Sequence, residues 1–234
     1  MPQHIYTTEY HDEISSTNDR VQELLRQPIP PQLPCLVVAR RQSAGRGRGN
    51  KRWWSSEGAI YMSLGFELSP EFLTRDQLPT FSATVAQSVI RVLSRHLPQH
   101  QLEVHLPNDV YVDGKKISGI LLESPTPQYG ILGIGLNVNN RLCDIPPEFL
   151  ADFADRPITS MIELLHKETD IARLTSELLS ELGFVVPDSS PLPKDGYSQS
   201  PPPEGEGRIN RVIRKCQVIG VSRYNLNIPP QTVK

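Results

Sequence analysis

Short apolar segments of β-strand length recur through the middle of this chain, and they narrow its fold more than any other feature does. They span residues 35–40, 59–67, 104–106, 110–112, 116–123 and 130–137. Helical periodicity is clearest over residues 77–96, where Val85, Val89 and Val92 share one face. Because strands gather in the middle, with helices before, between and after them, we expect an α+β fold with a mixed sheet covered by helices.

The remaining elements complete this expectation. A short strand is predicted over residues 5–13, and the hydroxyl of Ser16 or Thr17 can cap a helix that runs to about residue 26. Asp113-Gly114 is typical of a tight hairpin turn between the strands on either side of it. Two further helices are expected, and they cover residues 160–166 and 170–182.

A change of composition at Pro187 divides the chain. Residues 187–207 are rich in Pro, Ser, Gly and charge, and such a segment cannot bury enough apolar surface to offset its ordering entropy. We therefore expect one domain over residues 1–186, a linker over 187–207 and a short tail over 208–234.

Charge and cysteine usage exclude several classes of protein. The net charge is −2 and the pI about 6.3, so no global basic field recruits nucleic acid. Cys35, Cys143 and Cys216 match neither a zinc spacing nor a disulfide framework, which favours reduced thiols. Residues 1–11 lack an apolar signal core, and no apolar run could span a bilayer. We expect a soluble, cytoplasmic protein.

A Gly- and Arg-rich loop is the first candidate site. It runs from Gln42 through Gly45, Arg46 and Arg48 to Trp53. Glycines let backbone amides approach a ligand closely, and arginines add forked donors for phosphate or carboxylate. The loop therefore indicates an anion site, although a disordered segment or a single-stranded nucleic-acid patch with stacking tryptophans would have the same composition.

A second candidate site surrounds the Asp113-Gly114 turn. Pro107 fixes the path of the chain before Asn108 and Asp109, and Asp109 could hold a metal ion or a ribose. Lys116 lies seven positions further on, and a hairpin can bring its side chain back beside Asp109. A surface turn with solvated lysines remains open as an alternative.

Two shorter motifs complete the set. Glycines within the strand that ends in Gly133-Ile-Gly135-Leu-Asn137 indicate close approach by a ligand or by another backbone. The motif lacks the third glycine of a dinucleotide fingerprint, and a turn between core strands is its alternative. Ser15-Ser-Thr-Asn18 is, by itself, a helix cap.

In this order and at this spacing the motifs resemble the catalytic domain of biotin–protein ligases, which is related to that of lipoate–protein ligases. The resemblance covers residues 5–139 and extends in weaker form to residue 182. It implies a mixed, largely antiparallel sheet packed with helices. It also implies that ATP and Mg²⁺ activate biotin as biotinyl-5′-adenylate, which is then transferred to a lysine of the biotin carboxyl-carrier protein of a carboxylase. No nucleic acid or membrane partner is expected, and a homodimer is left open.

The resemblance also assigns roles to residues of this chain. It implies catalytic roles for Lys116, Arg48 and Arg46. For biotin binding it implies Ser16, Thr17, Asn18, Gln42, Gly45, Arg46, Tyr61, Ser63, Lys116, Gly119 and Leu121. For nucleotide binding it implies Arg48, Trp53, Asn108, Asp109 and Asn137, with Asp109 also as the metal ligand.

The sequence departs from the family in two places. His105-Leu106 stands where the family usually has Lys-Trp, and the tail of about 27 residues is too short for the family's C-terminal small β-barrel. An N-terminal DNA-binding domain is also lacking, so a repressor role is not expected. Three alternatives to the ligase stay open, namely a lipoate or octanoate ligase or transferase, a non-catalytic biotin or nucleotide binder, and a single-stranded nucleic-acid binder.

Overall fold

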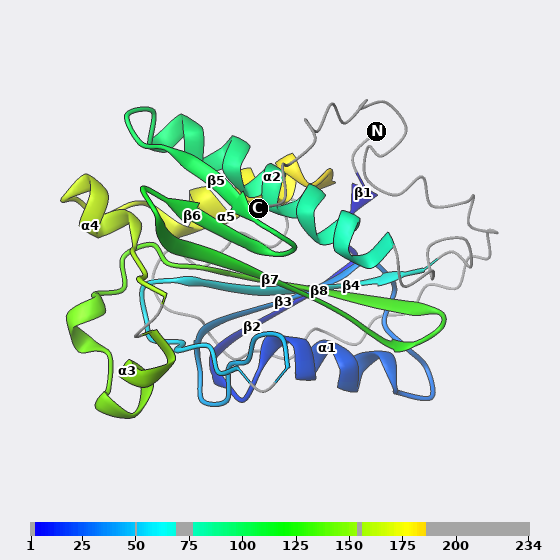
Figure 1. The fold of residues 1–234 in the computed structure, drawn as a ribbon. Coiled ribbons are helices and arrows are strands. Elements are labelled where there is room, and N and C mark those ends of the chain that lie inside the picture. The colour runs from blue at the N-terminus through cyan, green and yellow to red at the C-terminus, as the bar shows by residue number, and fades with distance from the viewer. Residues whose placement is uncertain (1–2, 50, 69–76, 154–155, 186–234) are drawn as a thin grey trace, which may run out of the picture.

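The computed structural model describes residues 3–49, 51–68, 77–153 and 156–185 (Figure 1). The linker predicted over residues 187–207 and the tail predicted over 208–234 lie outside the described residues.

A seven-stranded sheet forms the centre of the protein. Its strands lie in the order β2 (Thr7–Ile14), β3 (Cys35–Gln42), β4 (Ile60–Glu67), β8 (Tyr129–Leu136), β7 (Lys115–Thr126), β6 (Asp109–Val112) and β5 (Leu102–His105). Neighbours pair antiparallel except β2 and β3, which are parallel. This arrangement confirms the expected α+β fold with a mixed, largely antiparallel sheet.

Helices cover both faces of the sheet (Figure 1). Helix α1 (Thr17–Leu25) packs on one face against β3, β4 and β8, and α2 (Gln77–His96) and α5 (Ile171–Glu181) lie together on the other. The 3₁₀ turn at Leu142–Asp144 and helices α3 (Pro147–Phe153) and α4 (Met161–Leu165) follow β8. A separate parallel pair joins β1 (Gln3–His4) to β9 (Phe184–Val185).

The buried strand β3 shows why the two faces hold separate cores. Leu36 and Val38 belong to the larger core under α2 and α5, whereas Cys35 and Val37 belong to the smaller core under α1. Side chains alternate between the faces of a strand, and a strand covered on both faces is therefore apolar throughout. The continuous apolar run of β3 in the sequence reflects this double burial.

Several element boundaries differ from the sequence prediction. The first long strand begins at Thr7 rather than Ile5, although the Ile5 side chain is buried in the core. The strand predicted over residues 104–106 ends at His105, and the Leu106 side chain is 75% exposed. Its ladder ends there because Pro107 has no N–H to donate and β6 returns at Asp109.

The predicted hairpin turn is confirmed. Asp113 and Gly114 both have positive φ angles, 50° and 74°, as a two-residue turn between antiparallel strands requires. Helices α2, α4 and α5 also match their predicted ranges to within about one residue.

Among the described residues, no helix combines the length and the apolar character that a membrane crossing needs.

Candidate functional site

Small residues on the α1 face of the central strands form the floor of a cavity. The strand register places Gly135 beside Gly119 on one side and Tyr61 on the other, while Gly133 lies between Leu121 and Ser63. Few large side chains therefore rise from this part of the sheet, which leaves a cavity of about 720 Å³. A volume of this order suits a site for a small organic ligand.

The indole of Trp53 lies on the paired glycines of the floor. A Cβ atom at Gly119 would be 2.9 Å from Cζ3 of Trp53, and one at Gly135 would be 2.8 Å from Cε2. No side chain larger than hydrogen fits beneath the ring at either position. The Nζ of Lys116 lies 5.1 Å from the ring centroid, within the range of a cation–π contact. Gly119 and Gly135, which lie side by side on neighbouring strands, thus serve the same aromatic side chain.

The N-terminus of α1 forms a polar wall of the cavity. Ser16 caps the helix by accepting from the backbone N–H of Asp19, which leaves Thr17 and Asn18 in the first turn. The backbone N–H of Thr17 donates to Oε1 of Gln42 at 2.8 Å. The side chain of Asn18 lies directly over Gly133, where a Cβ atom would collide with its Oδ1.

Ser63 supports this wall from below. Its Oγ is fully buried and lies 2.7 Å from Oγ1 of Thr17 and 2.5 Å from Oδ1 of Asn18. Ser63 has one proton to donate to these two oxygens, and the hydroxyl of Thr17 also donates to Oε1 of Gln42 at 3.2 Å. Ser63 therefore fixes the wall rather than facing the cavity.

Gln42 connects the polar wall to the Gly- and Arg-rich loop. Its Oε1 accepts from Thr17, so its Nε2 donates, and it does so to Oγ of Ser55 at 2.9 Å. Ser55 in turn donates to the backbone carbonyl of Trp53 at 3.0 Å. The loop and the helix N-terminus are thus held by one continuous chain of hydrogen bonds.

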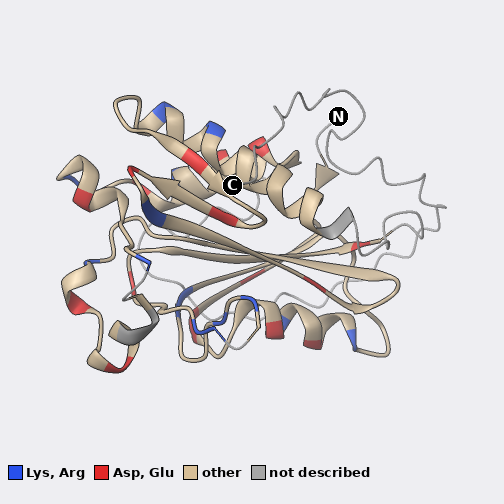
Figure 2. Cartoon of the chain, in the orientation of Figure 1, with Lys and Arg blue, Asp and Glu red and all other residues tan. Residues whose placement is uncertain are grey.

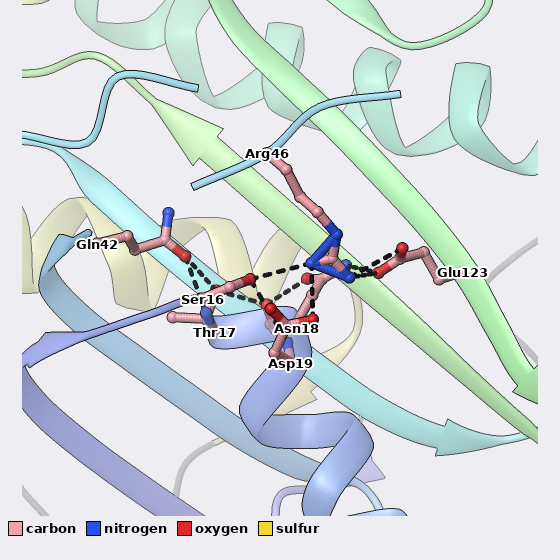
Figure 3. Close-up of polar contacts among 8 residues, drawn as sticks. Ser16, Thr17, Asn18, Asp19, Gln42, Arg46 and Glu123 are labelled. Carbon is pink, nitrogen blue, oxygen red and sulfur yellow. Dashed lines mark hydrogen bonds and ion pairs between the residues drawn. The ribbon is translucent and has the colours of Figure 1, made fainter. Parts of the chain in front are cut away.

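Arg46 lines the cavity with most of its donors engaged (Figure 3). Its NH2 lies 3.0 and 2.8 Å from the two carboxylate oxygens of Glu123, and its NH1 lies 2.8 Å from Oδ1 of Asp19. NH1 also donates to Oγ of Ser16 at 3.3 Å. The guanidinium is therefore held by carboxylates of the protein itself, at the edge of the polar wall.

Basic side chains form the opposite end of the cavity. Lys116 Nζ lies 2.8 Å from Oδ2 of Asp109, so the hairpin brings these two residues together as the sequence predicted. Burial lowers the pKa of Lys116, and the carboxylate of Asp109 opposes that effect. The positive charges of Arg156 and Lys51 lower the pKa further. Figure 2 shows basic segments of the loop over residues 41–58 beside the start of α1.

Backbone hydrogen bonds hold the segment after α3 beside Lys116. The N–H of Lys116 donates to the carbonyl of Pro157 at 2.8 Å, and the N–H of Thr159 donates to the carbonyl of Lys116 at 2.9 Å. Arg156 and Ile158 consequently lie at the rim of the cavity, next to the buried lysine.

The other residues predicted to bind nucleotide are anchored differently. Asn108 donates to the carbonyl of Ile120 at 2.9 Å and accepts from Arg48 at 3.4 Å. Asn137 is buried, and its amide donates to the carbonyl of Thr159 and accepts from Asn140. Asn108 and Arg48 thus present side chains at the mouth of the cavity, whereas the Asn137 side chain stabilises its wall.

The structure brings most of the predicted site residues into one cavity. Its lining includes Ser16, Thr17, Asn18, Gln42, Arg46, Arg48, Trp53, Tyr61, Asn108, Asp109, Lys116, Gly119, Leu121 and Asn137. Two predicted residues, Gly45 and Ser63, lie behind the wall. Gly45 packs against Ser55 and the carbonyl of Trp53 within the loop, where a Cβ atom would collide. Tyr61 is almost fully buried, which raises the pKa of its phenol, and its hydroxyl donates to the Ser56 carbonyl.

Sequence reasoning missed several residues of the site. Phe153 and Arg156 line the cavity from the unpredicted helix α3 and the segment that follows it. Glu123 and Asp19 hold Arg46. The alternation of β7 could have found Glu123, because it shares a strand face with Gly119 and Leu121.

The site offers one carboxylate to a metal ion. Among the described residues, no group of three or more His, Cys, Asp or Glu side chains is placed to hold a metal. Asp109 Oδ1 is nevertheless buried and has no hydrogen-bond partner within the described part of the chain.

Known proteins resemble this chain in both sequence and fold. The sequence profile of the biotin/lipoate A/B protein ligase family matches residues 10–137. The Bifunctional ligase/repressor BirA of Bacillus subtilis is 34% identical over 184 residues, which are 76% of this chain and 52% of that protein. The Biotin–[acetyl-CoA-carboxylase] ligase of Mycobacterium tuberculosis is 30% identical over 150 residues, 63% of this chain and 52% of the relative.

A solved structure gives the same result. The biotin protein ligase from Aquifex aeolicus in complex with biotin and ATP superposes with a TM-score of 0.60 at 30% identity, covering 75% of this chain and 68% of that one. The chain spans about half the length of the two curated relatives, at 52% of each. The profile match covers more than half of the chain and includes both the polar wall of the cavity and Lys116, so the chain belongs to the biotin/lipoate A/B protein ligase family.

Proposed function

We propose that this protein is an ATP-dependent biotin–protein ligase, which forms biotinyl-5′-adenylate and transfers biotin to a lysine of a carrier protein. The observation that carries the proposal is a single cavity with two chemically different ends. Thr17, Asn18 and Gln42 offer hydrogen bonds to a neutral polar ring at one end, while Arg48 and Lys116 offer positive charge at the other. The similar Aquifex aeolicus ligase, whose structure contains biotin and ATP, supports these two compounds as the ligands.

The first step joins two anions. The biotin carboxylate oxygen attacks the α-phosphorus of ATP, a new P–O bond forms, and the bond to the β-phosphate breaks to release pyrophosphate. Lys116 and Arg48 would neutralise the carboxylate and the phosphoryl oxygens as they meet, and Asp109 would orient the lysine through their 2.8 Å ion pair. In the second step the carrier amine attacks the acyl carbon, loses a proton, and AMP leaves.

The site suits a Mg²⁺ ion that is bound by one protein carboxylate, Asp109, and mainly by oxygens of the substrate. Mg²⁺ is commonly bound by one or two carboxylates together with phosphate oxygens, and Oδ1 of Asp109 is a buried carboxylate oxygen without a partner among the described residues. When bound there, the ion would neutralise charge on the phosphates. A biotin carboxyl-carrier protein is the proposed acceptor. The unpaired thiols of Cys35 and Cys143 support a cytoplasmic location.

Product analysis tests the proposal. The full chain is incubated with ATP and Mg²⁺ and with labelled biotin, labelled lipoic acid or no acid, and the acyl-adenylate and pyrophosphate are measured. We expect biotin-dependent release of pyrophosphate and accumulation of biotinyl-5′-adenylate. Turnover with lipoic acid in place of biotin would assign the other branch of the family. No turnover with either acid would overturn the ligase assignment and favour a non-catalytic binder.

A further inference from the structure

Glu123 contacts two separate parts of the cavity wall. It lies on β7 two positions beyond Leu121, which lines the cavity, and therefore on the same face of the sheet. Its Oε2 is 2.7 Å from Nδ2 of Asn18 and 2.8 Å from NH2 of Arg46, and its Oε1 is 3.0 Å from the same NH2. Figure 3 shows the carboxylate in contact with both side chains.

The contact with Glu123 fixes the orientation of the Asn18 amide. An ionised carboxylate only accepts hydrogen bonds, so Nδ2 of Asn18 must point to it. Oδ1 of Asn18 then points to the hydroxyl of Ser63 at 2.5 Å. With both ends of the amide committed, one N–H of Asn18 remains for a ligand.

The contact with Glu123 also ties the loop over residues 41–58 to the sheet. Within the described residues, the Arg46 guanidinium also contacts Ser16 and Asp19, which both lie at the N-terminus of α1. Glu123 supplies the charge-assisted contact from the sheet, and it accepts at both oxygens. Both side chains are about 30% exposed, at 29% for Arg46 and 31% for Glu123, so water screens the pair in part.

We propose that Glu123 is a positioning residue for the ligase reaction. Through Arg46 it holds the loop over the cavity, and through Asn18 it sets the hydrogen-bonding pattern of the polar wall, so the two adopt their binding geometry together. The inference rests on the proposed function. Glu123 itself acts through these neighbours and is absent from the cavity lining.

Glu123→Gln tests the inference because it keeps the shape of the side chain and removes its charge. The new Nε2 group would face Arg46 if it replaced Oε1, and both Arg46 and Asn18 if it replaced Oε2, so the contact with Arg46 is weakened in either orientation. We expect the KM for biotin in pyrophosphate release to rise about tenfold, equivalent to about 1.4 kcal/mol. The kcat should change less, because these contacts are made in the ground state and the transition state alike. Glu123→Asp keeps the charge but not the reach, and should be intermediate.

Glu181→Gln is the matched control. Glu181 on α5 also accepts from two arginines, Arg91 and Arg95, and its side chain is 22% exposed, but it lies on the opposite face of the sheet. We expect its biotin KM to equal that of the wild type. The melting temperature of each variant shows whether a change in KM reflects lost stability instead.

A double-mutant cycle supplies the second readout. If Glu123 acts through Arg46, then Glu123→Gln should raise KM much less on an Arg46→Gln background than on the wild type. A folded Glu123→Gln with wild-type KM, or fully additive effects in the cycle, would overturn the inference. If Glu123→Gln does not fold, Glu123→Asp decides, and a wild-type KM for it has the same meaning. A wild-type protein without biotin-dependent pyrophosphate release would instead overturn the proposed function.

Discussion

At the scale of single residues, the site divides its positive charges into two kinds. Arg46 is held by Asp19 and Glu123, whereas Lys116 is held by Asp109 and lies under the rim that carries Arg156. The carboxylates around Arg46 stabilise the loop. The buried amine of Lys116 instead has a carboxylate, Asp109, and a positive charge, Arg156, as neighbours. The sequence alone could not separate these roles, because Arg46 and Glu123 are 77 positions apart and their contact depends on the register of the sheet.

The pH dependence of the reaction should report on Lys116. Burial lowers the pKa of its amine below the ordinary value of 10.5, so the ammonium loses its proton at a lower pH than a solvated lysine does. If the charged form assists the first step, the alkaline limb of pyrophosphate release should lie below pH 10.5. Asp109→Asn removes the group that raises this pKa, so its alkaline limb should move to lower pH. Lys116→Ala should slow the step about 100- to 1,000-fold.

Pyrophosphate release measured across the alkaline range, at saturating biotin and ATP, checks this prediction. Lys116→Arg provides the control, because arginine stays charged over the whole range and any activity it retains should lack that limb. Identical alkaline limbs for the wild type and Asp109→Asn would mean that a different group titrates. Near wild-type turnover of Lys116→Ala would remove the lysine from the reaction.

Arg48→Gly should let the adenylate escape. The one side-chain hydrogen bond of Arg48 within the described residues is its 3.4 Å contact with Asn108, so its other guanidinium donors can face an anion in the cavity. A charge-assisted hydrogen bond contributes about 1.5–3 kcal/mol, and its loss should weaken retention of the intermediate. We expect biotin to appear on lysines of an added bystander protein such as serum albumin. Labelling that stays confined to the carrier, at undiminished activity, would contradict a guarding role.

At the scale of elements, hydrophobic periodicity and the residues typical of turns predicted most of the fold. The helix over residues 77–96 and the Asp113-Gly114 hairpin agree with the structure because local sequence determines both. Helix α3 was missed because Pro147–Phe153 makes only two turns, and Phe153 packs at the cavity rim rather than along a periodic apolar face. The sequence predicts close approach at the glycines of β8, but which groups approach depends on the folded loop and helix, because Trp53 lies on Gly135 and Asn18 lies on Gly133.

Gly135→Ala should displace Trp53. The added Cβ atom would lie 2.8 Å from the indole, and overpacking of this kind costs about 1–3 kcal/mol. We expect a higher KM for ATP together with a modest fall in melting temperature. Gly130→Ala on the same strand is the control, because its Cβ atom would meet the ring of Phe66, which does not line the cavity. That variant should lose stability and keep its KM for ATP. If the two variants change KM equally, Trp53 has no special place in nucleotide binding.

At the scale of the whole molecule, the described residues contain both the sheet and the site. The cavity is lined by residues between Ser16 and Ile158, and α5 and β9 complete the second face and the parallel pair with β1. The division predicted from composition at Pro187 lies outside the described residues and stays a prediction. The two residue segments beyond it, 187–207 and 208–234, carry none of the motifs that predicted the site.

Truncation after residue 207 should therefore spare adenylate formation. The shortened chain keeps β9 and its parallel pairing with β1, the core under α2 and α5, and every lining residue of the cavity. We expect biotin-dependent pyrophosphate release with unchanged KM for biotin and ATP, and a melting temperature close to that of the full chain.

Truncation after residue 182 is the contrasting variant. It removes Phe184, a buried core residue, together with β9, and loss of a buried phenylalanine costs about 3–5 kcal/mol. That variant should melt lower or fail to fold. If the chain shortened after residue 207 is itself insoluble or inactive, residues 208–234 contribute to the core, and the domain boundary predicted at Pro187 is wrong. If it forms adenylate normally but no longer labels the carrier, the tail instead takes part in the second step, which comparison of the two half-reactions on the same preparation would reveal.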